Sequence, residues 1–354
     1  MFKPIKKVEK LNLDYKPIVV KEGKDAPPDG YVVGNEGIGS SSAGSVCGVN
    51  PKNPPVKVAL EKLGTISREE PDTELQYVFD FGHNLEPAIL KLYEGKTGNK
   101  VEVDRSQFQH PLYPWMMADV DAFAVTPKGE KIGLEVKTFG PRMKYSWREG
   151  VYGEGGVPGS ISYIYQVAHS MAVMNLDRFD IVANWCNDPN ELIVITVHRD
   201  LQKELEIINK EGEFWANLQN RILPQDNTIS SDAFDSILKN LNRETVEEEN
   251  WEMANTYENV FDKILDLDLQ KKTLEEEIKK IDEEQNALKL KAIQEIGNHT
   301  KGTCGKYQFT FKGSERETVD SKLLKTKFPD TYEEVKKITE TKPTLRVKEV
   351  VIKQ

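Results

Sequence analysis

Apolar residues recur at helical spacing in four stretches of the chain. Between residues 73 and 96 they fall at steps of three and four, on Leu75, Val78, Phe79, Gly82, Leu85, Ile89 and Leu92. Residues 162–175, 200–220 and 260–297 repeat this spacing. Because one face of an α-helix returns every 3.6 residues, these stretches predict four amphipathic helices.

Shorter apolar runs, each of strand length, lie between the predicted helices. The central stretch, Trp115–Lys137, contains two such runs separated by Thr126–Gly129, which has the composition of a tight turn and indicates a β-hairpin. Further strand-like runs occupy residues 100–104, 107–109, 179–185 and 191–198. The order helix, hairpin, helix, strand, strand, helix predicts an α/β fold with a mixed central sheet flanked by helices.

The predicted hairpin carries Asp121, Glu135 and Lys137. Side chains alternate along a strand, so Glu135 and Lys137 project from one face, and Asp121 on the facing strand lies within reach. Carboxylate oxygens suit Mg²⁺, and a lysine ammonium holds the nucleophilic water or the scissile phosphate, so this combination fits phosphodiester hydrolysis. An isolated Glu-x-Lys, however, is far more often a solvated pair on a strand surface.

Three further features have a functional and a plain interpretation. Glu86 lies beside the apolar stripe of its helix, where a metal or a lysine is the expected partner. The serines of Gly37–Ala43 suit a phosphate cradle or, more often, a simple helix N-cap. The long segment Phe139–Gly159 suits substrate contact or ordinary packing around its tryptophan; its candidate residues are Arg142, Lys144, Trp147 and Arg148.

Charge is unevenly distributed along the 354 residues. The formal net charge is -10, but residues 247–284 contain 14 acids and 5 lysines, whereas residues 301–354 contain 13 basic and 8 acidic residues. The acidic stretch overlaps a heptad seam at Ile264, Leu267, Leu274, Ile278, Ile281, Leu288 and Ala292. We expect a long coiled-coil-like helix that serves as a helical hairpin or an oligomer contact, because its charge repels phosphate. The basic residues of segment 301–354 could contact phosphate or form an ordinary solvated surface.

The sequence shows neither a membrane-spanning apolar run nor, in residues 1–7, the apolar region of a signal peptide, which indicates an intracellular protein. Cys47, Cys186 and Cys304 are too widely spaced for a Cys-x-x-Cys motif, and we expect buried thiols.

Five motifs occur in an order that resembles the YqaJ-type viral recombinases, relatives of the phage lambda exonuclease within the restriction-endonuclease-like PD-(D/E)xK superfamily. They are Phe81–Pro87, Tyr93 with Thr97-Gly98, Ala118–Asp121, Gly133–Lys137 and Tyr165–Val173. The resemblance covers about Gly37–His198. It implies a restriction-endonuclease-like core.

The resemblance also implies roles for single residues. Asp121 and Glu135 would be metal ligands with Glu86 near the metals, and Lys137 would be the catalytic lysine. The remaining implied site residues are Gln166 on the helix after the hairpin and Ser41 at the terminal 5′ phosphate. Its neighbour Ser40 and, from the composition of their segment, Arg142, Lys144 and Arg148 are further candidate substrate contacts. Two departures weaken the match: Asp119-Val120-Asp121-Ala122 replaces the frequent Ser-Pro-Asp-Gly, and Gly34 stands where relatives have an arginine.

The implied function is a DNA exonuclease that uses Mg²⁺, with Mn²⁺ as a substitute. It would degrade duplex ends, 5′ to 3′, and leave 3′ single strands for a single-strand annealing recombinase. By resemblance we expect a homo-oligomeric ring and a phage or prophage protein in the bacterial cytoplasm. The alternatives are an endonuclease of the same superfamily and an inactive DNA-binding scaffold. A Cas4-like iron-sulfur nuclease is disfavoured, because three dispersed cysteines do not supply four thiolates.

The combined pattern divides the chain into four parts. We predict a lead-in at residues 1–33, a nuclease core at 34–224, a helical coiled-coil-like segment at 225–299 and a small C-terminal α+β cap at 300–354.

Overall fold

The structure is a computed structural model that forms two compact units, Met1–Glu244 and Thr245–Gln354. The described residues are 6–22, 36–67, 73–139, 160–185, 188–225, 229–242, 255–313 and 319–336. The predicted division of the chain into four parts stays a prediction.

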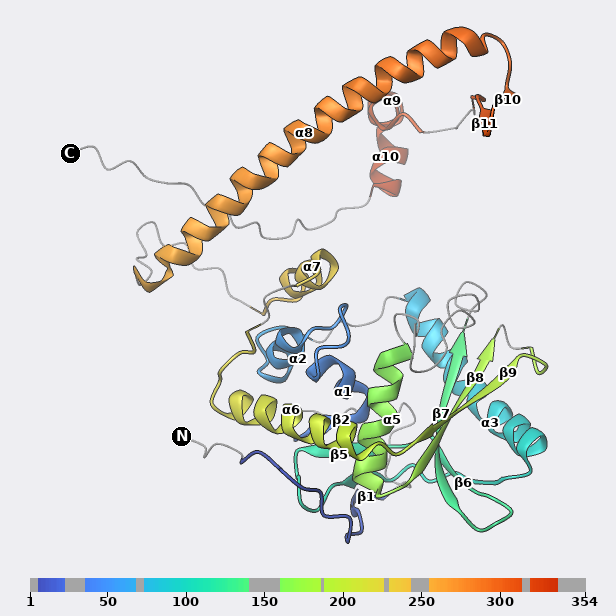
Figure 1. Ribbon diagram of the computed structural model, residues 1–354, viewed down its shortest axis with the longest axis vertical. Helices are drawn as coiled ribbons and strands as arrows, with labels where there is room; N and C mark the ends of the chain where they lie inside the picture. The colour runs from blue at the N-terminus through green and yellow to red at the C-terminus, as the bar shows by residue number, and fades with distance from the viewer. Residues whose placement is uncertain are drawn as a thin grey trace. The chain divides into compact units, whose positions relative to one another are not determined.

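A five-stranded mixed sheet forms the centre of the first unit, in the order β3-β6-β7-β8-β9 (Figure 1). Its strands are β3 (Lys100–Glu102), β6 (Ala122–Val125), β7 (Lys131–Phe139), β8 (Arg178–Trp185) and β9 (Leu192–His198). All neighbours are antiparallel except β7 and β8, which are parallel and joined by a crossover. The predicted mixed α/β fold is therefore confirmed.

Helices pack on both faces of this sheet. On one face, α3 (Thr73–Thr97) buries Ile89, Leu90 and Tyr93 against alternate residues of β6, β7 and β8. On the other, α5 (Ser160–Met174) and α6 (Leu201–Gln219) build the larger core (Figure 1). Since strand side chains alternate, β7 sends Leu134 to α3 and Glu135 to the opposite side, where α5 lies.

A second, four-stranded sheet has the order β1-β4-β5-β2. Its strands are β1 (Ile18–Lys21), β4 (Gln107–Gln109), β5 (Met116–Asp119) and β2 (Ile38–Gly39). Chain segment β5 leads directly into β6, so the two sheets are joined at Asp121. The accompanying helices are α1 (Ser40–Val46), α2 (Pro55–Lys62) and α7 (Ser231–Lys239).

The predicted hairpin is formed by β6 and β7, with Ala122 opposite Leu134 and Val125 opposite Lys131. In its turn, the Gly129 amide donates to the Thr126 carbonyl at 2.8 Å, and Gly129 adopts φ 82°, which favours glycine. Two details of the prediction are wrong. The apolar run Trp115–Ala118, expected as the first strand of the hairpin, lies mostly in β5 of the second sheet, and Asp121 is not on the facing strand but in a bend one residue before β6.

The apolar stripe of α3 is buried only in its second half. Val78 and Phe79 are 61% and 47% exposed, although the spacing placed them on the buried face. Pro87 lies inside α3, and a proline removes one helical hydrogen bond and bends the axis. Only the residues after it, from Ile89 to Tyr93, follow the sheet closely enough to be buried.

The second unit contains the long helix α8 (Glu258–Ile296), preceded by the 3₁₀ turn η2 (Asn255–Tyr257). Gly297 ends α8 with φ 57°, as the sequence predicted. Because α8 is continuous, it is not itself a helical hairpin. After it follow β10 (Lys301–Cys304), β11 (Tyr307–Thr310), α9 (Ser321–Lys327) and α10 (Pro329–Val335).

Some predictions fall partly outside the described residues. Cys47 is buried, but Cys304 is exposed, contrary to expectation, and Cys186 lies outside the described residues. Residues 337–354, the last part of the predicted C-terminal cap, also lie outside them. Among the helices that the structure describes, none is both long and apolar enough to cross a membrane.

Candidate active site

Asp121 and Glu135 face each other where the β6–β7 hairpin meets the second sheet. Continuing the register from the Ala122–Leu134 pair places residue 121 opposite residue 135. The Val136 amide donates to Asp121 Oδ2 at 2.6 Å, which fixes the aspartate against β7 although it precedes the strand. Glu135 is only 4% exposed.

Two donors converge on a single oxygen of Glu135. Lys137 Nζ donates to Glu135 Oε1 at 2.5 Å, and Gln166 Nε2 donates to the same atom at 2.6 Å. Lys137 follows two residues after Glu135 on β7, and Gln166 lies on α5, which packs over this face of the sheet. The structure thus brings together the glutamate, lysine and glutamine singled out in the sequence.

Glu86 approaches the same site from α3. The helix packs closely on β7 at this point, since a Cβ atom added to Gly82 would lie 3.1 Å from Thr138 Oγ1. Arg105 forms an ion pair with Glu86, with Nη2 3.6 Å from Oε1. The sequence predicted a metal or a lysine as the partner of Glu86, and the structure shows Arg105 in that position.

Carboxylate charge dominates the electrostatics of the site. Burial raises the pKa of Asp121 well above its ordinary value, and the charges of Glu135 and Glu86 add to this, against Lys137 and the Val136 amide. Burial also raises the pKa of Glu86, with Glu135 adding to it and Arg105 and His83 opposing it. Burial alone would lower the pKa of Lys137. The negative charges of Glu135 and Asp121 have the larger combined effect, so the pKa of Lys137 is raised.

Burial is thus the main cause of the raised pKa of Asp121 and of Glu86, and neighbouring carboxylates add to it. Within the described ranges, no group of three or more His, Cys, Asp or Glu side chains is arranged to hold a metal ion by itself. Mg²⁺, however, commonly takes one or two carboxylates and completes its shell with waters and substrate phosphate. The facing carboxylates of Asp121 and Glu135 fit that requirement by their chemistry.

Asp119 belongs to a different environment. It lies on β5 opposite Gln107 of β4, and Gln107 lies opposite Lys21 of β1. Burial raises the pKa of Asp119 to about 6, an effect that Gln107 and Lys21 oppose. The pKa of Asp119 is not influenced by Glu86, Asp121 or Glu135. Asp119 therefore lies away from the facing carboxylates.

The serines divide into a buried and an exposed residue. Ser170 Oγ donates to Ser40 Oγ at 2.9 Å, and Ser40 is buried, whereas Ser41 is exposed. The helix cap favoured by the sequence is wrong in detail, because the N-cap of α1 is Gly39, without a side-chain hydrogen bond. The loop candidates Arg142, Lys144, Trp147 and Arg148 lie outside the described residues.

The sequence reasoning missed two residues that contact this site. Tyr163 places its ring 5.0 Å from Lys137 Nζ, a distance at which a cation and an aromatic face attract. Tyr163 lies three positions before Gln166 on α5, and residues three apart share a helix face, so this spacing was a usable signal. Arg105 lies between β3 and β4, and no pattern in the sequence pointed from it to Glu86.

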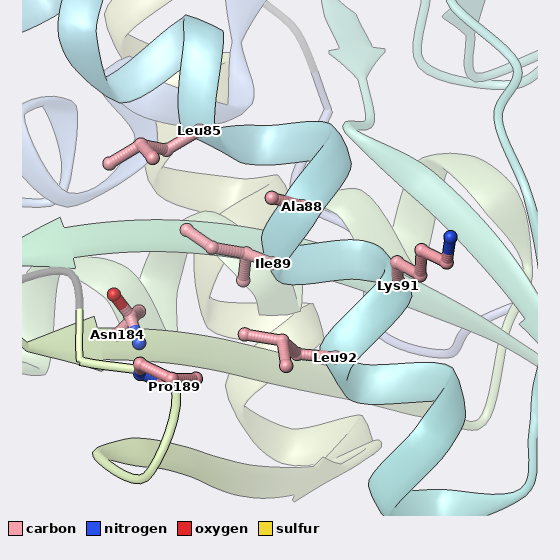
Figure 2. A pocket seen from close by; sticks show the side chains of 7 residues that line it. All are labelled: Leu85, Ala88, Ile89, Lys91, Leu92, Asn184 and Pro189. Atoms are coloured by element: carbon pink, nitrogen blue, oxygen red, sulfur yellow. The ribbon is translucent and has the colours of Figure 1, made fainter.

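A separate pocket lies between α3 and the end of β8 (Figure 2). Its volume is about 440 Å³, and its lining residues are Leu85, Ala88, Ile89, Lys91, Leu92, Asn184 and Pro189. None of the candidate catalytic residues lines it. With a single cation among mostly apolar side chains, it does not suit a phosphodiester backbone.

Comparison with known proteins bears on the same part of the chain. Residues 33–177 match the family model described as the YqaJ-like viral recombinase domain. The matched residues include all five motifs that resemble the YqaJ-type viral recombinases. It is also similar to the uncharacterized protein YqaJ of Bacillus subtilis strain 168, with 28% identity over 331 residues that cover 91% of this chain and 94% of that protein.

Two solved structures share part of this architecture. One is an alkaline exonuclease, LHK-Exo, from Laribacter hongkongensis, with 19% identity and a TM-score of 0.42 over 52% of this chain and 89% of that one. The other is a phage-related exonuclease from Haemophilus somnus 129PT, with 13% identity and a TM-score of 0.36 over 52% of this chain and 96% of that one.

Proposed function

We propose that this protein is a metal-dependent deoxyribonuclease with a restriction-endonuclease-like core, which hydrolyses phosphodiesters from the ends of duplex DNA. The observation that carries the proposal is the pair of facing carboxylates, Asp121 and Glu135, with Lys137 bonded to Glu135 at 2.5 Å. The match of residues 33–177 to a viral recombinase domain supports DNA as the substrate.

Asp121 and Glu135 would hold Mg²⁺, with Mn²⁺ as a substitute, and Glu86 would add a third negative charge nearby. When bound, the ion supplies an acidic water and neutralises charge on the phosphate. The Val136 amide holds Asp121 in place from the backbone, at 2.6 Å. Because this anchor does not depend on a side-chain rotamer, the aspartate is preorganised for its role.

Lys137 would hold the nucleophilic water or a phosphate oxygen. Its raised pKa keeps the side chain a cation throughout the neutral range, so it acts by its charge rather than as a base. Gln166, which donates to Glu135 at 2.6 Å, orients the carboxylate, and Glu135 would then help to hold the metal. Ser41, which is exposed, and Ser40 at the start of α1, together with Arg142, Lys144 and Arg148, are proposed as substrate contacts.

We further propose, from the family resemblance, that degradation runs 5′ to 3′ and leaves 3′ single strands for an annealing recombinase. On the same basis we propose a homo-oligomer, ring-shaped as in relatives. These steps concern the same site but need their own tests, because polarity and assembly do not follow from the carboxylates and the lysine.

Incubation with duplexes labelled at one 5′ or one 3′ end, and with closed circular duplex, tests the proposal. We expect the linear duplexes to be degraded only with Mg²⁺ or Mn²⁺, with early release of the 5′ label and no cutting of the circle. A Lys137→Ala preparation, purified in parallel, controls for contaminating nucleases. Equal cutting of the circle would favour the endonuclease, and no cutting of any substrate would favour a DNA-binding scaffold.

A further inference from the structure

Helix α8 exposes a long apolar stripe. No residue along its described length is buried, and Leu267, Leu274, Ile278, Ile281 and Leu288 are each more than half exposed. A 39-residue helix of this kind is about 58 Å long. Single exposed apolar residues are ordinary, but a continuous stripe of this length indicates an interface.

The stripe follows a heptad repeat with a definite composition. With Ile264 at position a and Leu267 at position d, the following a positions are Lys271, Ile278 and Gln285, and the following d positions are Leu274, Ile281 and Leu288. Ile264 at a with Leu267 at d is the combination that favours a parallel pair of helices, whereas Ile278 with Ile281 by itself favours larger bundles. A polar residue at a, here Lys271 and Gln285, fixes the register of such a pair at some cost in stability.

The flanking charges also fit a second copy of α8 in parallel register. In that arrangement a g residue faces the e residue five positions later on the partner helix. Lys263 would then face Asp268 of the other copy, and Glu284 would face Lys289. Glu277 against Asp282 is the unfavourable contact, so attractive pairs outnumber repulsive ones.

An antiparallel pair fits less well. Centred on the helix, it would place Glu275 and Glu277 each against the same residue of the other copy and Asp268 against Asp282. Shifting it by one heptad either places Glu277 against Glu284 and Glu275 against Asp282, or leaves Leu288 without a partner before the start of α8 at Glu258. Only the parallel arrangement keeps all d positions paired and most charges complementary.

We propose that α8 forms a parallel, in-register, two-stranded coiled coil with α8 of a second copy of this chain. The seam consists of Ile264, Leu267, Leu274, Ile278, Ile281 and Leu288. This dimer contact is separate from the carboxylate site in the first unit, so it stands whether or not the proposed nuclease activity is correct.

Cysteine cross-linking in the full-length chain tests both pairing and direction. In a parent whose three native cysteines are replaced by alanine, Leu274→Cys should oxidise to a covalent dimer. Because the two thiols face each other at a millimolar effective concentration, this should occur on the order of a hundredfold faster than for Asn286→Cys, the matched variant on the outer face of α8. Mixing Leu274→Cys with Gln285→Cys should give dimers linked 274 to 274 or 285 to 285, and few linked 274 to 285.

A second measurement follows the mass of the protein by light scattering. Ile278→Asp places a charge in the seam and should reduce the mass, whereas Asn286→Asp adds the same charge on the outer face and should not. Preferential linkage of residue 274 to residue 285 would overturn the parallel arrangement. Equal cross-linking of Leu274→Cys and Asn286→Cys, or an unchanged mass for Ile278→Asp, would overturn the interface itself.

Discussion

Replacing Glu135 with glutamine removes one charge from the centre of the site and keeps the shape of the side chain. Glu135 is buried, and its Oε1 atom accepts hydrogen bonds from both Lys137 and Gln166. In Glu135→Gln, the proposed metal loses one of its two facing carboxylates. Lys137 also loses its closest counterion, whose charge raises the pKa of this lysine against the effect of burial.

The magnitude follows from the loss of one preorganised charge in a water-poor site. Such a loss costs about 3 kcal/mol in the transition state, or roughly a hundredfold in kcat. The affinity for Mg²⁺ should fall as well, because Asp121 remains as the single facing ligand. DNA binding should persist or strengthen, since a negative charge near the phosphates is gone.

Three assays on one preparation separate these effects: nuclease rate on end-labelled linear duplex, metal binding by calorimetry, and DNA binding by gel shift. The matched control is Glu130→Gln, the same change on the same hairpin at an exposed position, whose Oε2 lies 3.8 Å from Arg178. A folded Glu135→Gln protein that digests DNA at the wild-type rate would refute the placement of the active site. Thermal unfolding checks that the variant is folded.

Three other changes probe neighbouring features. Tyr163→Leu removes the ring next to Lys137 and should lower kcat about fivefold, whereas Tyr163→Phe keeps the ring and the rate, as measured by steady-state kinetics. Asp119→Asn should leave metal-dependent hydrolysis within about twofold of wild type, because Asp119 faces Gln107; loss of Mg²⁺ binding in calorimetry would instead make it a ligand. Gly133→Ala would bring a Cβ atom 2.1 Å from the buried Phe179 ring and should destabilise the fold by about 1–3 kcal/mol in denaturant unfolding.

The sequence predicted the elements of the first unit well, because their apolar spacing is regular and their turns have distinctive residues. The β6–β7 hairpin is the clearest case, since Thr126–Gly129 both suits a turn by composition and forms one. Helix α3 shows the limit of such reasoning. The apolar spacing of α3 continues through Val78 and Phe79, but both residues are exposed. Burial depends on how the helix lies against the sheet, and Pro87 lies between these residues and the buried part of α3.

The site was predictable where it depends on local geometry and not where it depends on distant contacts. Alternation along β7 placed Glu135 and Lys137 on one face, and their side chains do meet at 2.5 Å. The pairing of Arg105 with Glu86 joins residues from a loop and a helix, so no periodicity encodes it. The same holds for Ser40, whose partner Ser170 lies on α5, 130 positions later.

The arrangement around Glu135 also explains why an acid-x-lysine pair here differs from one on a strand surface. On a surface, water screens both charges, and such a pair contributes little. Here burial raises the pKa of Asp121 and Glu86, while Lys137 is the cation bonded to Glu135. Folding therefore brings three carboxylates into a water-poor site, where protonation, pairing or a bound cation must offset their charge. A divalent cation bound together with a DNA phosphate would do so, because the ion offsets the carboxylates and the phosphate completes its shell.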